Sequence, residues 1–264
     1  MCELFGLSSG RPVSFTCSLD RFAAHGSLEG PNHDGWGIAA YEGRDARIIK
    51  EPAAAAQSEW VRFIEHHGVT SPLVIAHIRR ASEGVRSFAN THPFNRELGG
   101  RRHVFAHNGT LVDIRRHLPQ SGDFHPIGET DSEYAFCVLL GRLAEVWAQP
   151  SAPSAATRHA IVAQFAAELS RFGPANFIYS DGELLFAHGD RRQHDTGEVR
   201  PPGLYLVQHS DTRRDRSWLA SGVDVSGPDQ PIAILASVPL TNESWRPLAQ
   251  GELLMISDGR VMAP

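Results

Sequence analysis

The order of its apolar segments constrains the fold of this chain more than any other feature. Short apolar runs bounded by Gly, Pro and Asn predict two blocks of strands, and the best helical patterns follow one another near the middle. The strands are predicted at 3–8, 35–42, 46–50, 73–79 and 102–107, then at 176–180, 183–188, 203–209, 231–238 and 252–256. The helices are predicted at 57–67, 130–147 and 155–172. Because strands and helices do not alternate strictly, the pattern favours a layered α+β fold with mostly antiparallel sheets over a doubly wound parallel sheet.

The domain organisation follows from length and composition. With 264 residues the chain can bury a large core in one or two domains. One change of composition, the Ala-, Pro- and Ser-rich stretch 148–154, is typical of a loop between helices and is too short for a domain linker. We therefore expect residues 1–264 to form a single domain.

The charged residues exclude several classes of protein. Lys50 is the only lysine among 25 basic residues, so no phosphate-binding loop of the G-x-x-x-x-G-K-[S/T] type exists. Schiff-base chemistry would depend on that one amine. The net charge of −5 argues against a nucleic-acid partner, which needs a basic face. None of the 14 histidines lies in an H-E-x-x-H motif, and we expect neither a metal nor a cofactor.

The cysteines and the N-terminus indicate the compartment. Three cysteines, at positions 2, 17 and 137, form no C-x-x-C pair and leave an odd one over, which excludes a disulfide framework. The N-terminus has no signal-peptide pattern, and no long apolar run predicts a membrane span. We expect a cytoplasmic protein without a membrane partner.

Cys2 is the first candidate for chemistry. Removal of Met1 would place a thiol and a free α-amine on one residue. The amine could then act as the base for the thiol, since their reference pKa values are about 7.7–8.0 and about 8.5. Taken alone, a cysteine at position 2 is better explained as an incidental small residue, so the case depends on the rest of the chain.

Two predicted strands end in polar groups. His77 and Arg79 point to one face of the first, and the guanidinium fork suits a carboxylate, although a surface ion pair is the simpler explanation. Asn108 and Gly109 follow the second strand. Asn-Gly is usually only a turn, yet its amide and N–H could also donate to a developing oxyanion.

Asp131 lies at the start of a predicted helix. Thr130 and Glu133 have the spacing of a capping box, which puts Asp131 and Ser132 in the first turn. The Asp131 carboxylate could complement the helix dipole, bind a substrate ammonium group, or do both.

Taken together and in this order, these segments resemble the glutamine-hydrolysing domain of class II (N-terminal nucleophile, Ntn) amidotransferases, above all the free-standing YafJ-like branch. The resemblance runs through residues 1–6, 33–37, 76–79, 90–94, 106–109 and 128–133, and more weakly through 239–245. It implies a four-layer αββα sandwich with two mostly antiparallel sheets.

The resemblance also implies the catalytic roles. Cys2 would be the nucleophile, with its freed α-amine as the general base, attacking the side-chain amide of glutamine. Asn108 and the N–H of Gly109 would form the oxyanion hole. These roles agree with the chemistry of each residue type.

Substrate binding is implied for a second set of residues. Arg79 would bind the α-carboxylate of the substrate and Asp131 its α-ammonium group. We expect further contacts on this side from His77, Ser82 and His92.

Two departures from the family pattern affect what the protein would do. An aromatic residue and a histidine usually follow the arginine, where this chain has Arg80 and Glu83, so the γ-glutamyl substrate is open. We also expect no synthase domain that would use the ammonia, because a glutaminase-sized domain accounts for the 264 residues. Three hypotheses follow: a free-standing hydrolase of glutamine or a γ-glutamyl compound, a glutaminase subunit that serves a separate synthase or acceptor-binding chain, and a non-catalytic binding or regulatory protein.

Overall fold

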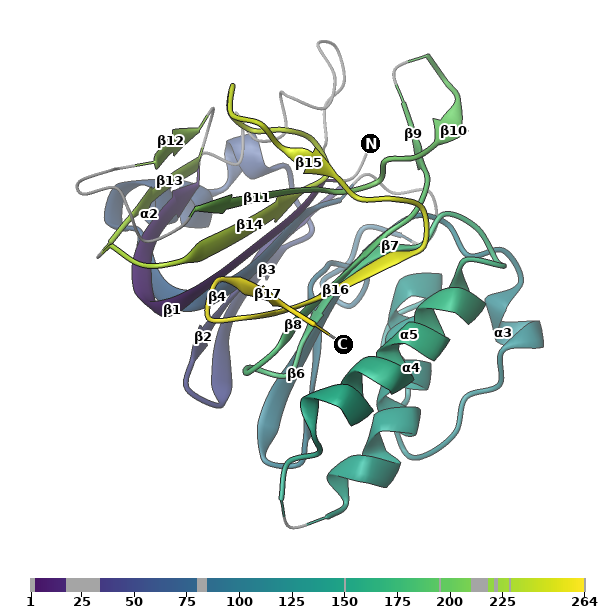
Figure 1. Ribbon diagram of the computed structural model, residues 1–264. Coiled ribbons are helices and arrows are strands. Elements are labelled where there is room, and N and C mark those ends of the chain that lie inside the picture. The colour runs from purple at the N-terminus through teal and green to yellow at the C-terminus, as the bar shows by residue number, and fades with distance from the viewer. Residues whose placement is uncertain are drawn as a thin grey trace.

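Two antiparallel sheets form the centre of the molecule (Figure 1). The computed structural model describes residues 3–17, 34–79, 85–149, 151–194, 196–209, 218–220, 223–227 and 229–263. Within them, the first sheet has the order β15-β11-β14-β1-β4-β2-β3, with β13 also paired to β1 and β12 paired to β13. The second sheet has the order β17-β16-β8-β7-β6-β5.

The bounds of the elements are as follows. The first sheet contains β1 (Glu3–Cys17), β2 (Trp36–Glu42), β3 (Asp45–Glu51), β4 (Val69–Ile78), β11 (Tyr205–His209), β12 (Trp218–Ala220), β13 (Val223–Ser226), β14 (Ile232–Ala236) and β15 (Arg246–Pro247). The second contains β5 (Phe94–Leu98), β6 (Arg101–Asn108), β7 (Asn176–Ser180), β8 (Leu185–Gly189), β16 (Glu252–Ser257) and β17 (Arg260–Met262). A separate hairpin joins β9 (Arg192–Gln193) and β10 (Val199–Arg200). The helices are η1 (Ala55–Gln57), α2 (Glu59–His67), α3 (Ile114–His117), α4 (Asp131–Trp147) and α5 (Ala155–Leu169).

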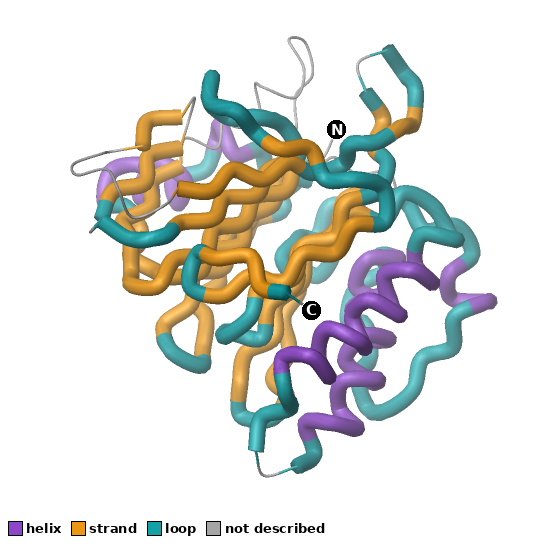
Figure 2. Tube along the Cα trace, in the orientation of Figure 1, coloured by secondary structure: helices purple, strands orange, loops and turns teal. Residues whose placement is uncertain are grey.

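Helices cover the outer faces of the paired sheets (Figure 2). The buried apolar side chains form three clusters, one for each interface between layers. The cluster between α2 and the first sheet includes Phe5, Trp36 and Ile64. The cluster between the sheets includes Leu4, Ile75 and Ile178. The cluster under α4 and α5 includes Phe105, Phe136 and Leu139. The expected four-layer αββα arrangement with antiparallel sheets is therefore confirmed.

Strand periodicity explains how β1 serves two of these cores. Successive side chains of a strand point to opposite faces, so Leu4 packs between the sheets and Phe5 packs under α2. β1 is longer than the predicted strand 3–8, because the chain continues to pair with β4 beyond a shift of register between Ser8 and Val13. The predicted strand ended at residue 8, and the residues that follow include Gly10 and Pro12, which are weak strand formers.

Local capping explains the start of α4. The Thr130 hydroxyl accepts a hydrogen bond from the Glu133 N–H at 3.2 Å, as the capping-box spacing predicts. The other hydrogen bond of a capping box, from the Thr130 N–H to the Glu133 side chain, was predicted wrongly. The Glu133 carboxylate instead accepts from Arg96 at 2.6 Å and from the Gly128 N–H at 2.7 Å. Glu133 thus ties the loop before α4 to β5.

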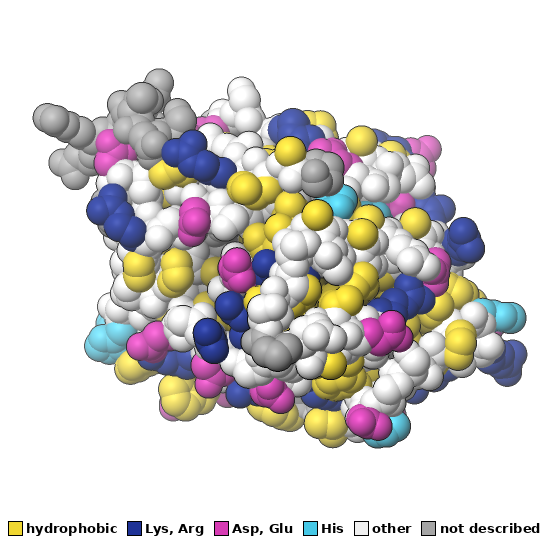
Figure 3. All heavy atoms as spheres, turned by 60° about the horizontal axis from the view of Figure 1, so that its bottom comes forward, with side chains coloured by type: hydrophobic (Ala, Val, Ile, Leu, Met, Phe, Trp, Pro, Cys, Tyr) yellow, Lys and Arg dark blue, Asp and Glu magenta, His cyan; other side chains and the backbone are white. Residues whose placement is uncertain are grey.

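The described surface mixes both signs of charge. Figure 3 shows Lys and Arg side chains interspersed with Asp and Glu over one face of the molecule. No helix among the described residues is both long and apolar enough to cross a membrane.

Candidate active site

Strands of both sheets begin or end at one edge of the sandwich. Glu3, the first residue of β1, pairs with Ile78, the last residue of β4, so the chain enters β1 where it leaves β4. Asn108 ends β6 in the second sheet, which contacts β4 across the interface. This edge therefore carries the start of the chain and the residues that follow β4 and β6.

Two of the expected site residues, Cys2 and Ser82, lie outside the described residues, as do Arg80 and Glu83. Glu3 nevertheless fixes where the chain begins its first strand.

Arg79 is held by its own backbone and by the segment before β2. Its N–H donates to the Gly35 carbonyl at 2.7 Å, and its Nη1 donates to the Asp34 carbonyl at 3.4 Å. The side chain is only 3% exposed, so the guanidinium is fixed within the edge rather than spread on the surface. A buried fork of this kind is suited to a carboxylate.

The Asn108-Gly109 pair is fixed by contacts behind it. The Asn108 carbonyl accepts a hydrogen bond from Nδ2 of Asn176 at 3.2 Å. A Cβ atom at position 109 would lie 1.8 Å from the Pro174 carbonyl oxygen, so only glycine fits. The backbone after β6 thus packs directly against the segment before β7.

Asp131 is bound to the same loop that carries Gly109. Its Oδ2 accepts from the Leu111 N–H at 2.6 Å, and its Oδ1 accepts from the Ser132 N–H at 2.7 Å. The Ser132 hydroxyl lies 3.1 Å from Oδ1 of Asp131 and 2.9 Å from Nδ1 of His107. These bonds fix the carboxylate in the first turn of α4, where the helix dipole also favours a negative charge.

Both ring nitrogens of His107 have polar partners. Its Nε2 lies 3.2 Å from the Pro174 carbonyl, which can only accept, so Nε2 carries a proton, and its Nδ1 lies 2.9 Å from the Ser132 hydroxyl. Burial lowers the pKa of His107, and the nearby Asp131 carboxylate partly opposes that shift. The histidine is therefore a neutral link between β6 and α4.

His77 and His92 form a pair of tilted rings in contact behind the edge. Their ring centroids are 4.2 Å apart, and both side chains are buried. Burial lowers the pKa of His77 to about 3, with smaller contributions from His107 and Arg79, and it lowers the pKa of His92 as well. Both rings are thus uncharged near neutral pH, which suits packing behind the site better than binding a charged group.

Lys50 and Asn90 hold the loop that leads into His92. The Lys50 ammonium donates to the Thr91 carbonyl at 2.8 Å and lies 4.6 Å from the ring centroid of Phe88. Burial lowers its pKa to about 8. The Asn90 side chain accepts from the Glu129 N–H at 2.8 Å and so joins this loop to the residues before Asp131.

The structure thus brings together six of the eight residues expected from the sequence, namely His77, Arg79, His92, Asn108, Gly109 and Asp131. Sequence reasoning missed Asn176 and Ser132 as partners of these residues; Ser132 stood inside a recognised motif, but Asn176 had no comparable signal. Among the described residues, no group of three or more His, Cys, Asp or Glu side chains could hold a metal ion.

Comparison with known proteins identifies the family. The model of the class-II glutamine amidotransferases matches residues 1–264. The chain belongs to this family. Within it, the chain is 35% identical to YafJ of Escherichia coli (strain K12) over 253 residues, covering 96% of each protein. It is also 35% identical to the uncharacterised protein MJ1515 of Methanocaldococcus jannaschii, covering 99% of this chain and 71% of that one.

Solved structures of the amidotransferase family share the fold. A protein from Pseudomonas aeruginosa, named as a predicted glutamine amidotransferase, is 34% identical and superposes with a TM-score of 0.75 over 100% of both chains. The glutamine phosphoribosylpyrophosphate amidotransferase of B. subtilis superposes with a TM-score of 0.62 at 18% identity, covering 99% of this chain and 48% of that one. The second likeness concerns the fold alone. The chain thus belongs to the YafJ-like class II glutamine amidotransferase family and has the four-layer sandwich fold.

Proposed function

We propose that this protein hydrolyses the side-chain amide of glutamine or of another γ-glutamyl compound, with Cys2 as the nucleophile. The observation that supports the proposal most directly is the meeting of β1, β4 and β6 at one edge. Glu3 begins β1 opposite the end of β4, and Arg79, Asn108 and Asp131 lie around the same edge.

The first half of the proposed reaction forms a thioester. Once Met1 is removed, the α-amine of Cys2 takes the thiol proton, and the sulfur attacks the γ-carbonyl carbon. The carbonyl oxygen becomes an oxyanion, which would accept hydrogen bonds from the Asn108 amide and the Gly109 N–H. The C–N bond then breaks, and ammonia or an amine leaves with the proton from the α-ammonium group.

The second half releases the product. Water attacks the γ-glutamyl thioester, the same α-amine accepts its proton, and the C–S bond breaks to give glutamate and the free thiol. Throughout, Arg79 would bind the α-carboxylate and Asp131 the α-ammonium group. Because both charged groups are bonded to the α-carbon, these two contacts would anchor that end of the substrate and leave its γ-amide free to face the nucleophile.

Turnover by the purified protein tests this proposal. Protein whose mass shows the loss of Met1 should release glutamate from glutamine or from a γ-glutamyl compound in a substrate panel, and the Cys2→Ala variant should not. Activity by protein that retains Met1 would contradict the free-amine mechanism. Turnover only after a second protein is added would instead support a glutaminase subunit, and a lack of reaction between Cys2 and a glutamine-analogue electrophile would support a non-catalytic protein.

A further inference from the structure

The candidate catalytic groups come from two different sheets. Cys2 precedes β1 in the first sheet, whereas Asn108 ends β6 in the second sheet and Gly109 follows it. A sulfur atom and an oxyanion hole must be aligned to within a fraction of an ångström, and a misplacement of about 1 Å can cost about 100-fold in rate. Something must therefore fix the distance between the two sheets at this edge.

Asn176 holds the oxyanion side of the arrangement. Its side chain is fully buried at the first position of β7, paired with Asn108 in register. Nδ2 donates both to the Asn108 carbonyl at 3.2 Å and to the Arg191 carbonyl at 2.7 Å. Oδ1 accepts from the Asp190 N–H at 2.8 Å, so one amide joins the end of β6 to the segment 190–191.

A missing side chain at position 203 makes room for this amide. A Cβ atom on Gly203 would lie 1.6 Å from Oδ1 of Asn176, so the backbone before β11 packs directly on it. The Asn176 side chain is thus enclosed by backbone, and its three hydrogen bonds have fixed directions.

Arg192 continues the connection from segment 190–191 to the start of the chain. Its Nη2 lies 3.6 Å from Oε1 of Glu3, and its Nη1 donates to the Ser237 carbonyl. Ser237 also holds β1 directly, because its hydroxyl accepts from the Leu4 N–H at 2.9 Å and its N–H donates to the Leu4 carbonyl at 3.1 Å. The Arg192 side chain is 6% exposed and that of Glu3 is fully buried.

We propose that Asn176 and Arg192 are positioning residues that set the nucleophile of the first sheet against the oxyanion donors of the second. The connection runs from Asn108 through the Asn176 amide to the backbone of Arg191, then through the Arg192 guanidinium to Glu3, the residue bonded to Cys2. This role rests on the proposed function. It adds two residues that do not touch the substrate but act through the groups that do.

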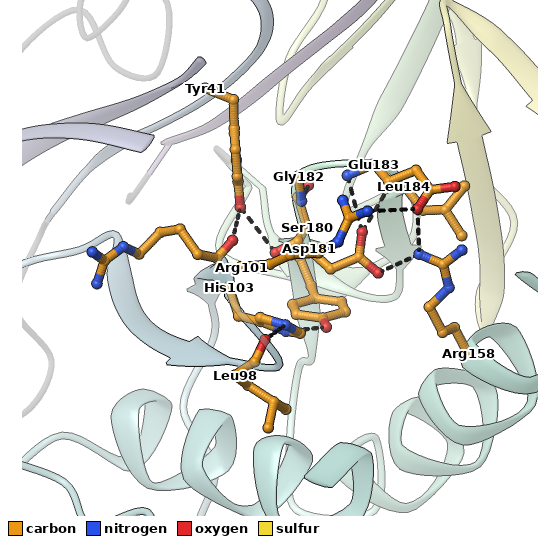
Figure 4. Close-up of polar contacts among 12 residues, drawn as sticks. Tyr41, Leu98, Arg101, His103, Arg158, Ser180, Asp181, Gly182, Glu183 and Leu184 are labelled. Carbon is orange, nitrogen blue, oxygen red and sulfur yellow. Dashed lines mark hydrogen bonds and ion pairs between the residues drawn. The ribbon is translucent and has the colours of Figure 1, made fainter. Parts of the chain in front are cut away.

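A second buried ion pair provides a matched comparison. Nη1 of Arg158 on α5 lies 2.8 Å from Oδ2 of Asp181, which follows β7 at the opposite end from Asn176 (Figure 4). The side chains of this pair are 4% and 0% exposed. It resembles the Glu3–Arg192 pair in burial and charge type and lies away from the candidate site, and Nη1 of Arg158 also lies 3.3 Å from Oε2 of the more exposed Glu183.

The two pairs allow a controlled experiment. The double variants Glu3→Gln/Arg192→Met and Arg158→Met/Asp181→Asn each remove both members of a buried ion pair, which avoids leaving a single buried charge. We would measure kcat and KM for hydrolysis, together with the rate at which iodoacetamide alkylates Cys2. Alkylation requires the thiolate but no oxyanion hole. Its rate therefore measures the reactivity of the Cys2 thiolate and does not depend on the alignment of the sulfur with Asn108 and Gly109.

Loss of alignment predicts a specific pattern. Glu3→Gln/Arg192→Met should lower kcat about 10- to 100-fold, with KM and the alkylation rate of Cys2 each changed less than about threefold. Arg158→Met/Asp181→Asn should keep kcat within about twofold of wild type. Arg192→Lys, which keeps the charge, should recover part of the lost kcat.

Other results would overturn the role. An unchanged kcat in a folded Glu3→Gln/Arg192→Met variant would do so, and so would an equal fall in the Arg158 control, which would indicate a general effect of ion-pair loss. If the double variant fails to fold, Asn176→Ala decides the question by the same measurements. Absence of turnover by the wild-type protein would overturn the proposed function together with the role, whereas normal wild-type turnover with unaffected variants would overturn the role alone.

Discussion

Replacing His103 with glutamine should make the stability of the protein less sensitive to acid. His103 is fully buried on β6, at the far end from Asn108. Its Nδ1 lies 2.7 Å from the Tyr179 hydroxyl and its Nε2 lies 3.1 Å from the Leu98 carbonyl, so the neutral ring satisfies both partners (Figure 4). Burial lowers its pKa to about 4, against a weaker opposing effect of Asp181.

The sign and size of the effect follow from proton linkage. An unfolded histidine has a pKa of about 6.5, so below that pH the unfolded chain binds a proton that the folded protein excludes. Stability is therefore intact above pH 6.5 and falls as the pH drops toward the folded pKa of about 4. Between pH 7.5 and pH 5.0, His103 alone should remove about 2 kcal/mol from the free energy of unfolding.

The assay compares two proteins at two pH values. Urea unfolding of wild type and His103→Gln at pH 7.5 and pH 5.0 gives a difference of differences, in which the packing cost of the substitution cancels. The acid-induced loss should be smaller by about 2 kcal/mol in the variant, equivalent to about 4 °C in Tm. His117→Gln, at an exposed position on α3, is the matched control and should lose as much as wild type. An equal loss in His103→Gln and wild type would refute the reasoning.

Three further predictions concern the candidate site and the buried thiol. Gly109→Ala places a methyl group 1.8 Å from the Pro174 carbonyl oxygen and should lower the free energy of unfolding by about 3 kcal/mol, measured by urea denaturation. Asp131→Asn keeps an oxygen for the Leu111 N–H but removes the charge, so KM for glutamine should rise about 10- to 100-fold; an unchanged KM would argue against ammonium binding there. Burial raises the pKa of Cys137 to about 11, so iodoacetamide at pH 8 should spare this thiol in the folded protein and modify it after denaturation, as peptide mass mapping would show.

Elements with a local signal could be predicted from the sequence. The apolar run in 35–42 corresponds to β2, and the Thr130 cap marks the start of α4, because both depend on neighbouring residues alone. β5 was missed, since Phe94–Leu98 has only one apolar residue at each end and is stabilised by pairing with β6. Glu133 was expected to cap its own helix, but Arg96 from another strand binds it more strongly than a local N–H could.

The candidate site divides in the same way. Arg79, Asn108 and Asp131 follow a strand or open a helix, so the sequence shows both their chemistry and their position at the end of an element. No sequence pattern indicates the roles of Asn176 and Arg192, because their contacts depend on how the second sheet and its hairpin pack against the first sheet. The spacing of residues along the chain does not show how the second sheet and its hairpin pack against the first sheet.

The sole lysine has a practical consequence for anyone who handles the protein. Reagents that couple to primary amines find two groups, the Lys50 side chain and the α-amine at the N-terminus. Lys50 is largely covered, with its ammonium bound to the Thr91 carbonyl and packed on Phe88. An amine-coupled surface or dye would therefore attach through the α-amine, which is the group proposed as the catalytic base. The labelled protein would then be inactive. Labels directed at introduced surface cysteines would avoid that outcome.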